Sequence, residues 1–212
     1  MLGELRGGGG QCLGAIDIPE LLARYHRRYP KVRVLFALGA HMRCIGSMGV
    51  GNLGVVFVTG STMSPHTQPA MSRRLVQWEI APESLALLAS PDLPVARSSR
   101  LSLLDLEREI FIDFEASWAM RAINDDAFAK AGLIRKVAFT VSGVHTLLDL
   151  VHRQLGIALV PRSIVSKPQA SGLTIIPIVG EDVPTWSLRM VMKAHDGTTN
   201  IANRFVEMLP AG

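Results

Sequence analysis

Residues 49–58 read GVGNLGVVFV and decide which kind of α/β fold the sequence encodes. Gly49, Gly51 and Gly54 match the spacing of the G-x-G-x-x-G fingerprint for dinucleotide binding. That fingerprint needs a strand before the glycines and a helix after them, because the helix N-terminus must present free N–H groups to the pyrophosphate. Here the apolar run 55–58 follows the glycines and is typical of a buried strand. The stretch therefore predicts a helix-to-strand turn, with no dinucleotide or other cofactor.

The segments around this turn alternate between strand and helix patterns. Predicted strands cover 2–8, 32–38, 55–58, 74–81, 84–89, 109–114, 137–141, 156–161, 173–178 and 187–193. A first predicted helix starts at Asp17 and stops at Pro30, and further helices cover 40–50, 117–131, 144–154 and 200–209. Pro82 separates two of the strands, and polar turn residues predict a loop at 59–71. Alternation of this kind implies parallel sheets with helices on their faces.

The order of these elements predicts an α/β protein of two lobes. If SLALLAS (84–90) and LTIIPI (173–178) are neighbouring crossovers, two strands form a hinge between the lobes. We then expect one lobe in 1–89 plus 174–212 and the other in 90–173. A cleft between such lobes, outside the carboxyl ends of strands, is the usual place for a small-molecule site.

Composition restricts the class of protein. A chain of 212 residues with 48% hydrophobic content can bury a substantial core. No apolar run reaches the roughly 18 residues of a membrane span, and the first residues lack the pattern of a secretion signal. Cys12 and Cys44 form no C-x-x-C pair and are expected as free thiols. These features predict a cytoplasmic globular protein.

Basic residues gather at the end of the first predicted helix and the start of the next strand. They are Arg24, Arg27, Arg28, Lys31 and Arg33, in a chain of net charge +4. Cations at this position complement the negative end of the helix dipole. We interpret the cluster in that way, with a nucleic-acid patch as the alternative.

Five longer stretches resemble one known family. They are PELLARYHRRYPKVRV (19–34), GNLGVVFV (51–58), ESLALLASPDLPVA (83–96), LSLLDLEREIFIDFEASWAMRAINDDAFAKAG (101–132) and TLLDLVHRQLGIALVPRSIV (146–165). In this order and spacing the sequence resembles the effector-binding, or substrate-binding, domain of LysR-type transcriptional regulators. The resemblance implies two Rossmann-like lobes of the type 2 periplasmic-binding-protein fold, an inducer pocket between them, and a homodimer formed by this domain. Regulators of this family carry a DNA-binding helix-turn-helix ahead of the domain, and we expect none in this chain.

Turns after parallel strands deliver helix N-termini, whose unpaired N–H groups suit a carboxylate or another anion. Four such turns follow strands here, starting at Gly10, Gly39, Glu115 and Ser142, and all four match pocket-lining positions of the family by resemblance. Thr59 follows the strand 55–58, and we expect it to line the same pocket. The predicted ligand-binding residues are Gln11, Cys12, His41, Met42, Thr59, Ala116, Ser117, Trp118, Ser142, Gly143 and Val144.

Several of these residues have an ordinary structural alternative. The hydroxyls of Ser117 and Ser142 can cap their own helices instead of binding a ligand. Thr59 can cap a loop. An exposed turn position or ordinary packing is the alternative for Gln11, His41 and Trp118.

Catalysis and metal binding find little support in the sequence. A helix N-terminus would favour a reactive thiolate at Cys12, but a nucleophile also needs a base and an orienting group. His145, Asp149 and His152 share a helix face that lies away from the leucines, which indicates a solvated surface and not a metal site. We therefore expect a non-enzymatic domain, and the resemblance implies that it senses a small, anionic or aromatic effector. A transporter's solute-binding protein and a small α/β enzyme remain as alternatives.

Overall fold

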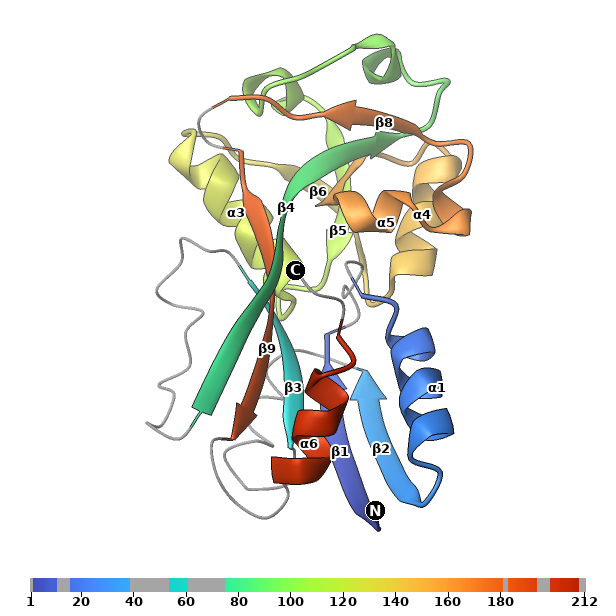
Figure 1. Cartoon of the computed structure of the whole chain (residues 1–212). Helices are drawn as coiled ribbons and strands as arrows, with labels where there is room; N and C mark the ends of the chain where they lie inside the picture. The colour runs from blue at the N-terminus through green and yellow to red at the C-terminus, as the bar shows by residue number, and fades with distance from the viewer. Residues whose placement is uncertain are drawn as a thin grey trace. The chain divides into compact units, whose positions relative to one another are not determined.

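The computed structural model describes residues 2–10, 16–38, 54–60, 75–180, 183–193 and 199–209 (Figure 1). The chain divides into two compact α/β units. The first consists of Met1–Thr59, Met63–Ala81 and Ser187–Gly212, and the second of Gly60–Thr62 and Pro82–Trp186. The chain therefore builds most of one unit, builds the other, and returns to the first.

A parallel sheet forms the centre of the first unit. Strand β1 (Gly3–Gly9) pairs in parallel with β2 (Val32–Leu38) on one side and with β3 (Val55–Gly60) on the other. The register places Gly9 opposite Leu38 and Phe57 opposite Gly9. The carboxyl ends of all three strands consequently lie at one edge of the sheet, as the alternation in the sequence predicts.

Helix α1 (Ile18–Arg28) joins β1 to β2 and starts and stops for local reasons. The carboxylate of Asp17 accepts a hydrogen bond from the backbone N–H of Glu20 at 3.0 Å, which caps the helix. Pro30 cannot continue the helix, and Tyr29 is the C-cap residue. The sequence prediction for this helix is confirmed.

The last helix, α6 (Thr199–Val206), packs into the core of the first unit. The hydroxyl of Tyr25 donates a hydrogen bond to the backbone carbonyl of Ile201 at 3.0 Å. The Tyr25 and Phe205 rings meet edge to face, with centroids 5.3 Å apart, and both side chains are fully buried. The C-terminal segment thus completes the unit in which the chain begins.

Two long strands pass from one unit to the other. Strand β4 (Leu75–Ala89) changes units between Ala81 and Pro82, and β9 (Thr185–Lys193) between Trp186 and Ser187. The strand order through the molecule is β2-β1-β3-β9-β4-β7, with β8 pairing β4. The molecule therefore has the predicted architecture of two lobes with a hinge of two crossover strands.

The hinge differs in detail from the sequence expectation. The prediction of two strands separated by Pro82 is wrong, because β4 is continuous. The ring of Pro82 fits an extended backbone, and the pairing of β4 with β7 begins only at Leu85, so no ladder hydrogen bond with β7 requires its N–H. Residues 82–89 and 174–186 belong to the second unit, since β8 pairs with Ala86–Ala89 and the chain crosses back only within β9.

The second unit follows the predicted strand and helix order from Ile110 onward. Strands β5 (Ile110–Phe114) and β6 (Lys136–Val141) pair in parallel. The other elements are α3 (Ala119–Lys130), α4 (Val144–His152), β7 (Ala158–Pro161), α5 (Arg162–Val165), β8 (Thr174–Pro177) and 3-10 turns at Pro94–Arg97, Leu104–Leu106 and Pro168–Ala170. The short helix α5 was not predicted from the sequence.

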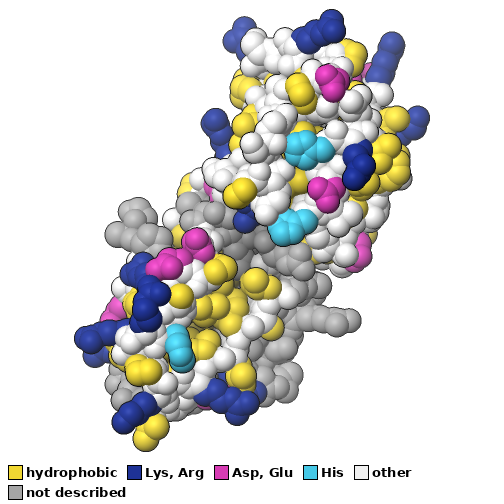
Figure 2. Space-filling view, turned by 90° about the vertical axis from the view of Figure 1, so that its right-hand side faces the viewer, with side chains coloured by type: hydrophobic (Ala, Val, Ile, Leu, Met, Phe, Trp, Pro, Cys, Tyr) yellow, Lys and Arg dark blue, Asp and Glu magenta, His cyan; other side chains and the backbone are white. Residues whose placement is uncertain are grey.

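Helix α4 is amphipathic in the predicted sense. Its buried side consists of Val144, Leu147, Leu148 and Val151. His145, Asp149 and His152 lie on the exposed side, and a ring nitrogen of His152 is hydrogen-bonded to the carbonyl of Gln169 at 3.0 Å. Histidine and acidic side chains are at the surface in the space-filling view (Figure 2). None of the helices in the described residues has the length and apolar character needed to cross a membrane.

Candidate functional site

Two helix N-termini in the second unit follow strands that end at the same sheet edge. The last residues of β5 and β6, Phe114 and Val141, are paired in register, and the backbone N–H of Glu115 donates to the carbonyl of Val141 at 3.2 Å. The turns that follow these strands therefore start at the same edge and lead into α3 and α4. They bring together Ala116, Ser117, Trp118, Ser142, Gly143 and Val144, six of the predicted site residues.

Neither helix has a side-chain cap. The N-cap residue is Trp118 for α3 and Gly143 for α4, and neither residue makes a side-chain capping hydrogen bond. The first N–H groups of a helix have no partner within the helix, and each N-terminus carries roughly half a positive charge. Two such ends at one sheet edge favour an anionic ligand group.

Ser117 and Ser142 do not cap α3 and α4, which was the structural alternative for their hydroxyls. Ser117 and Ser142 each stand directly before the N-cap residue, and both are exposed. Within the described part of the chain, neither hydroxyl makes a hydrogen bond. α3 also begins at Ala119, two residues after the predicted start at 117. Both hydroxyls remain available to a ligand next to the uncapped N–H groups.

Trp118 and Val144 have their side chains packed into the unit. The Trp118 ring stacks on Phe114, with centroids 4.7 Å apart and an angle of 7° between the planes. Trp118 is 9% exposed and Val144 is 8% exposed. Ordinary packing, the alternative given for Trp118, is therefore what its side chain does. A ligand could contact Trp118 and Val144 mainly through their backbone groups.

In the first unit the structure describes one predicted site residue. Thr59 is buried near the end of β3, and a Cβ atom built on Gly10 would lie 3.5 Å from its Oγ1 atom. The ends of β1 and β3 therefore meet at Thr59. The other predicted residues, Gln11, Cys12, His41 and Met42, lie outside the described residues, as do Gly49 and Gly51 of the fingerprint and the predicted helix 40–50.

A buried polar cluster lies beside the end of β5, and sequence reasoning missed it. The carboxylate of Asp113 on β5 forms an ion pair with the guanidinium of Arg135, and the side chains of both are 2% exposed. The amide of Asn124 on α3 donates to Asp113 at 3.3 Å and to the carbonyl of Leu159 at 3.1 Å. Asp113 is the lone charged residue in the apolar strand IFIDF, which is the signal that could have revealed the cluster.

Aromatic rings cover the cation of this cluster. The Arg135 guanidinium lies 5.3 Å from the ring centroid of Phe111 and 5.4 Å from that of Phe128. It also pairs with the partly exposed carboxylate of Asp125 on α3. These contacts join the end of β5 to α3 and to the residue that precedes β6.

Comparison with known families now identifies the chain. Residues 2–212 match the LysR substrate binding domain. The chain belongs to this family. A curated LysR-domain relative, the HTH-type transcriptional regulator SoxR of Arthrobacter sp. (strain TE1826), is 23% identical over 192 residues, which cover 91% of this chain and 61% of that protein. The regulator GltR of Bacillus subtilis (strain 168) is 26% identical over 170 residues, covering 80% and 53%. The chain thus spans little more than half the length of these LysR-type relatives.

Solved LysR domains have the same fold. The C-terminal domain of a probable LysR family regulator from Rhodococcus sp. RHA1 superposes with a TM-score of 0.81 at 18% identity and full coverage of both chains. The regulatory domain of Synechocystis PCC6803 CcmR, in complex with 2-PG, gives 0.82 at 20% identity, covering 98% of this chain and 95% of that one. The BenM effector binding domain with its effector benzoate gives 0.75 at 19% identity, covering 98% and 90%. These likenesses establish the two-lobed fold of LysR effector-binding domains.

Proposed function

We propose that this chain is the effector-sensing module of a LysR-type transcriptional regulator and that its effector is a small organic anion. The observation that carries the proposal is that α3 and α4, which follow neighbouring strand ends, both have uncapped N-termini with Ser117 and Ser142 just before their N-cap residues. Carboxylate or phosphate oxygens can accept from these N–H groups and hydroxyls.

The chemistry of one relative supports the choice of an anion. The effector in the BenM domain is benzoate, an aromatic carboxylate. In this chain the turn after β5 and the turn after β6 supply the donors for such a group. Gln11, Cys12, His41, Met42 and Thr59 are proposed to complete the site from the first unit, as the family resemblance implies.

The proposed mechanism couples effector binding to a change in conformation and involves no catalysis. An effector that binds one arrangement of the two units more tightly than another shifts the population toward that arrangement. β4 and β9 are the two strands that any such change must bend or twist, because each passes from one unit to the other. In a full-length regulator, the preference would pass through a homodimer of this domain to DNA-binding segments. A cytoplasmic location follows from the same proposal.

A ligand screen by thermal unfolding tests the proposal. A bound effector at 100 times its dissociation constant adds about 2.7 kcal/mol of stability. For a domain of this size that corresponds to a rise in Tm of roughly 5–10 °C. We expect a hit among organic acids, including aromatic ones. The absence of any stabilising compound among organic acids, aromatics and amino acids would contradict the proposal.

Matched serine variants then locate the site. Ser117→Ala and Ser142→Ala should each weaken binding of the hit, because each removes a hydroxyl donor beside the helix N-termini. Ser99→Ala makes the same change at an exposed position outside these turns and should leave binding unchanged. Equal affinities in all three variants would show that the ligand binds elsewhere.

A further inference from the structure

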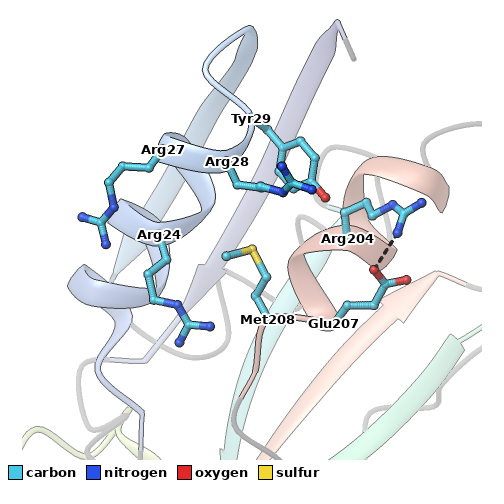
Figure 3. A pocket seen from close by; sticks show the side chains of 7 residues that line it. All are labelled: Arg24, Arg27, Arg28, Tyr29, Arg204, Glu207 and Met208. Carbon is cyan, nitrogen blue, oxygen red and sulfur yellow. Dashed lines mark hydrogen bonds and ion pairs between the residues drawn. The ribbon is translucent and has the colours of Figure 1, made fainter.

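A hollow in the first unit is lined by arginines. It has a volume of about 600 Å³ and lies between α1 and α6 (Figure 3). Its lining consists of Arg24, Arg27, Arg28, Tyr29, Arg204, Glu207 and Met208. In the close-up, Met208 lies between the two helices, Arg28 and Tyr29 face the side of Arg204, and Arg27 points away from α6.

The hollow keeps an excess of positive charge. Arg27 pairs with Glu20 and Arg204 with Glu207, each at 3.0 Å. Within the described part of the chain, Arg24 and Arg28 pair with no carboxylate, and the Arg28 guanidinium lies 6.0 Å from the Tyr29 ring. Two unpaired guanidinium groups therefore remain at the hollow.

The helix dipoles do not cancel this charge. The C-terminal ends of α1 and α6 each contribute about half a negative charge, or about one in total. The two positive charges of the unpaired arginines exceed this negative charge. Arg204 is a further cation at the hollow, and it is paired with the carboxylate of Glu207. The interpretation drawn from the sequence, that these cations complement the helix dipole, therefore accounts for only part of the basic cluster.

The hollow is preformed. Beneath it, Tyr25 donates its hydrogen bond to Ile201, and its ring contacts Tyr29 at 5.0 Å and Phe205 at 5.3 Å between centroids. These buried contacts fix α1 against α6. A ligand therefore meets arginines held by two packed helices and has to order only their side chains.

This hollow is separate from the proposed effector site. Pairing of Gly3 with Val32 places the start of β2, and with it the C-terminal end of α1, at the amino edge of the sheet. Gly10 and Thr59 lie at the carboxyl edge. The hollow and the first-unit residues proposed for the effector site are thus at opposite edges of the same sheet.

From this geometry we propose that the α1–α6 hollow is a second binding site, for a small multivalent oxyanion. Guanidinium groups bind phosphate and carboxylate oxygens through paired hydrogen bonds. The hollow is open to solvent and has room for a small molecule between the two helices. The phenol of Tyr29 and the side chain of Met208 border the hollow beside the cations.

The test is calorimetric titration of the protein with pyrophosphate, and in a second arm with citrate, at constant ionic strength. We expect saturable binding of at least one of them. Arg24→Gln/Arg28→Gln should weaken it at least tenfold. Arg108→Gln/Arg153→Gln removes two exposed arginines of the second unit and should leave it unchanged.

The Glu207→Gln variant distinguishes oxyanion binding from a purely structural role of the arginines. It removes the carboxylate that occupies Arg204 and should tighten oxyanion binding severalfold. Weak, non-saturating heats that are equal in all variants would overturn the proposal. So would binding of a DNA duplex that depends on Arg24 and Arg28 when pyrophosphate and citrate do not bind.

Discussion

The guanidinium of Arg135 and the carboxylate of Asp113 form an ion pair inside the second unit, where each side chain is only 2% exposed. Asn124 donates a second hydrogen bond to the same carboxylate oxygen, Oδ2, while Oδ1 accepts from the backbone N–H of Phe114 at 2.7 Å. The pair links the strand that precedes Ser117 to the segment that enters β6. It therefore holds β5 against the amino end of β6.

Removing one partner of this pair should be costly. Arg135→Gln leaves the Asp113 charge buried and unpaired, and we expect a loss of about 3–5 kcal/mol in the free energy of unfolding. Lys130→Gln is the control, because the Lys130–Asp126 pair is exposed and worth less than about 1 kcal/mol. Denaturant titration measures both variants. Equal losses would show that the buried pair contributes no more than a surface one.

Gly156 should tolerate no side chain. A Cβ atom there would lie 2.6 Å from the carbonyl oxygen of Ile110, which already accepts a hydrogen bond from the backbone N–H of Ile157 at 2.8 Å. Because the obstacle is hydrogen-bonded backbone, Gly156→Ala should cost about 1–3 kcal/mol. At Gly54 the added atom would lie 3.4 Å from the Arg6 carbonyl, an ordinary contact, so Gly54→Ala should cost less. Thermal or denaturant unfolding compares the two, and a costlier Gly54→Ala would refute the steric argument.

Tyr25 should make stability fall at high pH. Burial, and to a lesser degree the neighbouring Tyr29, raises the pKa of Tyr25 to about 12 from its ordinary value of 10.0. A raised pKa means that the folded state prefers the neutral phenol. This stabilising contribution is complete below pH 10 and is lost as the pH rises through about 12.

Tyr25→Phe tests that assignment. It removes the hydrogen bond to Ile201 and leaves a buried carbonyl without its partner, at a cost of about 1–3 kcal/mol at neutral pH. The variant should also lose less stability than the wild type between pH 10 and 12. Ultraviolet absorbance should show one of the two tyrosines ionising near pH 12. A wild type in which both ionise near pH 10 would contradict the assignment.

Much of the fold could be predicted from the sequence because its signals are local. Asp17 and Pro30 mark the ends of α1 within a few residues, and strand alternation indicates the parallel pairing. Pro82 misled the prediction, because a proline breaks a strand only where its missing N–H is needed for pairing. That depends on the neighbouring strands, which a single segment does not reveal.

The turns that carry the proposed site residues were predictable in position but not in detail. The rule that helices begin after parallel strands located Ser117 and Ser142, but the exact N-cap residue depends on backbone angles that the residue type leaves open. The Asp113–Arg135 pair spans 22 positions, and no periodic pattern connects the two residues. Buried pairs of this kind become visible only when the strands and helices are packed.

The most direct test of the central claim is backbone-amide NMR of the protein titrated with the organic acid found by the thermal screen. We predict saturable shifts of the first-turn amides of α3, Ala119–Arg121, and of α4, Val144–Thr146, with weaker binding in Ser117→Ala and Ser142→Ala. A stabilising ligand that saturates the protein while these six amides stay unshifted would contradict it.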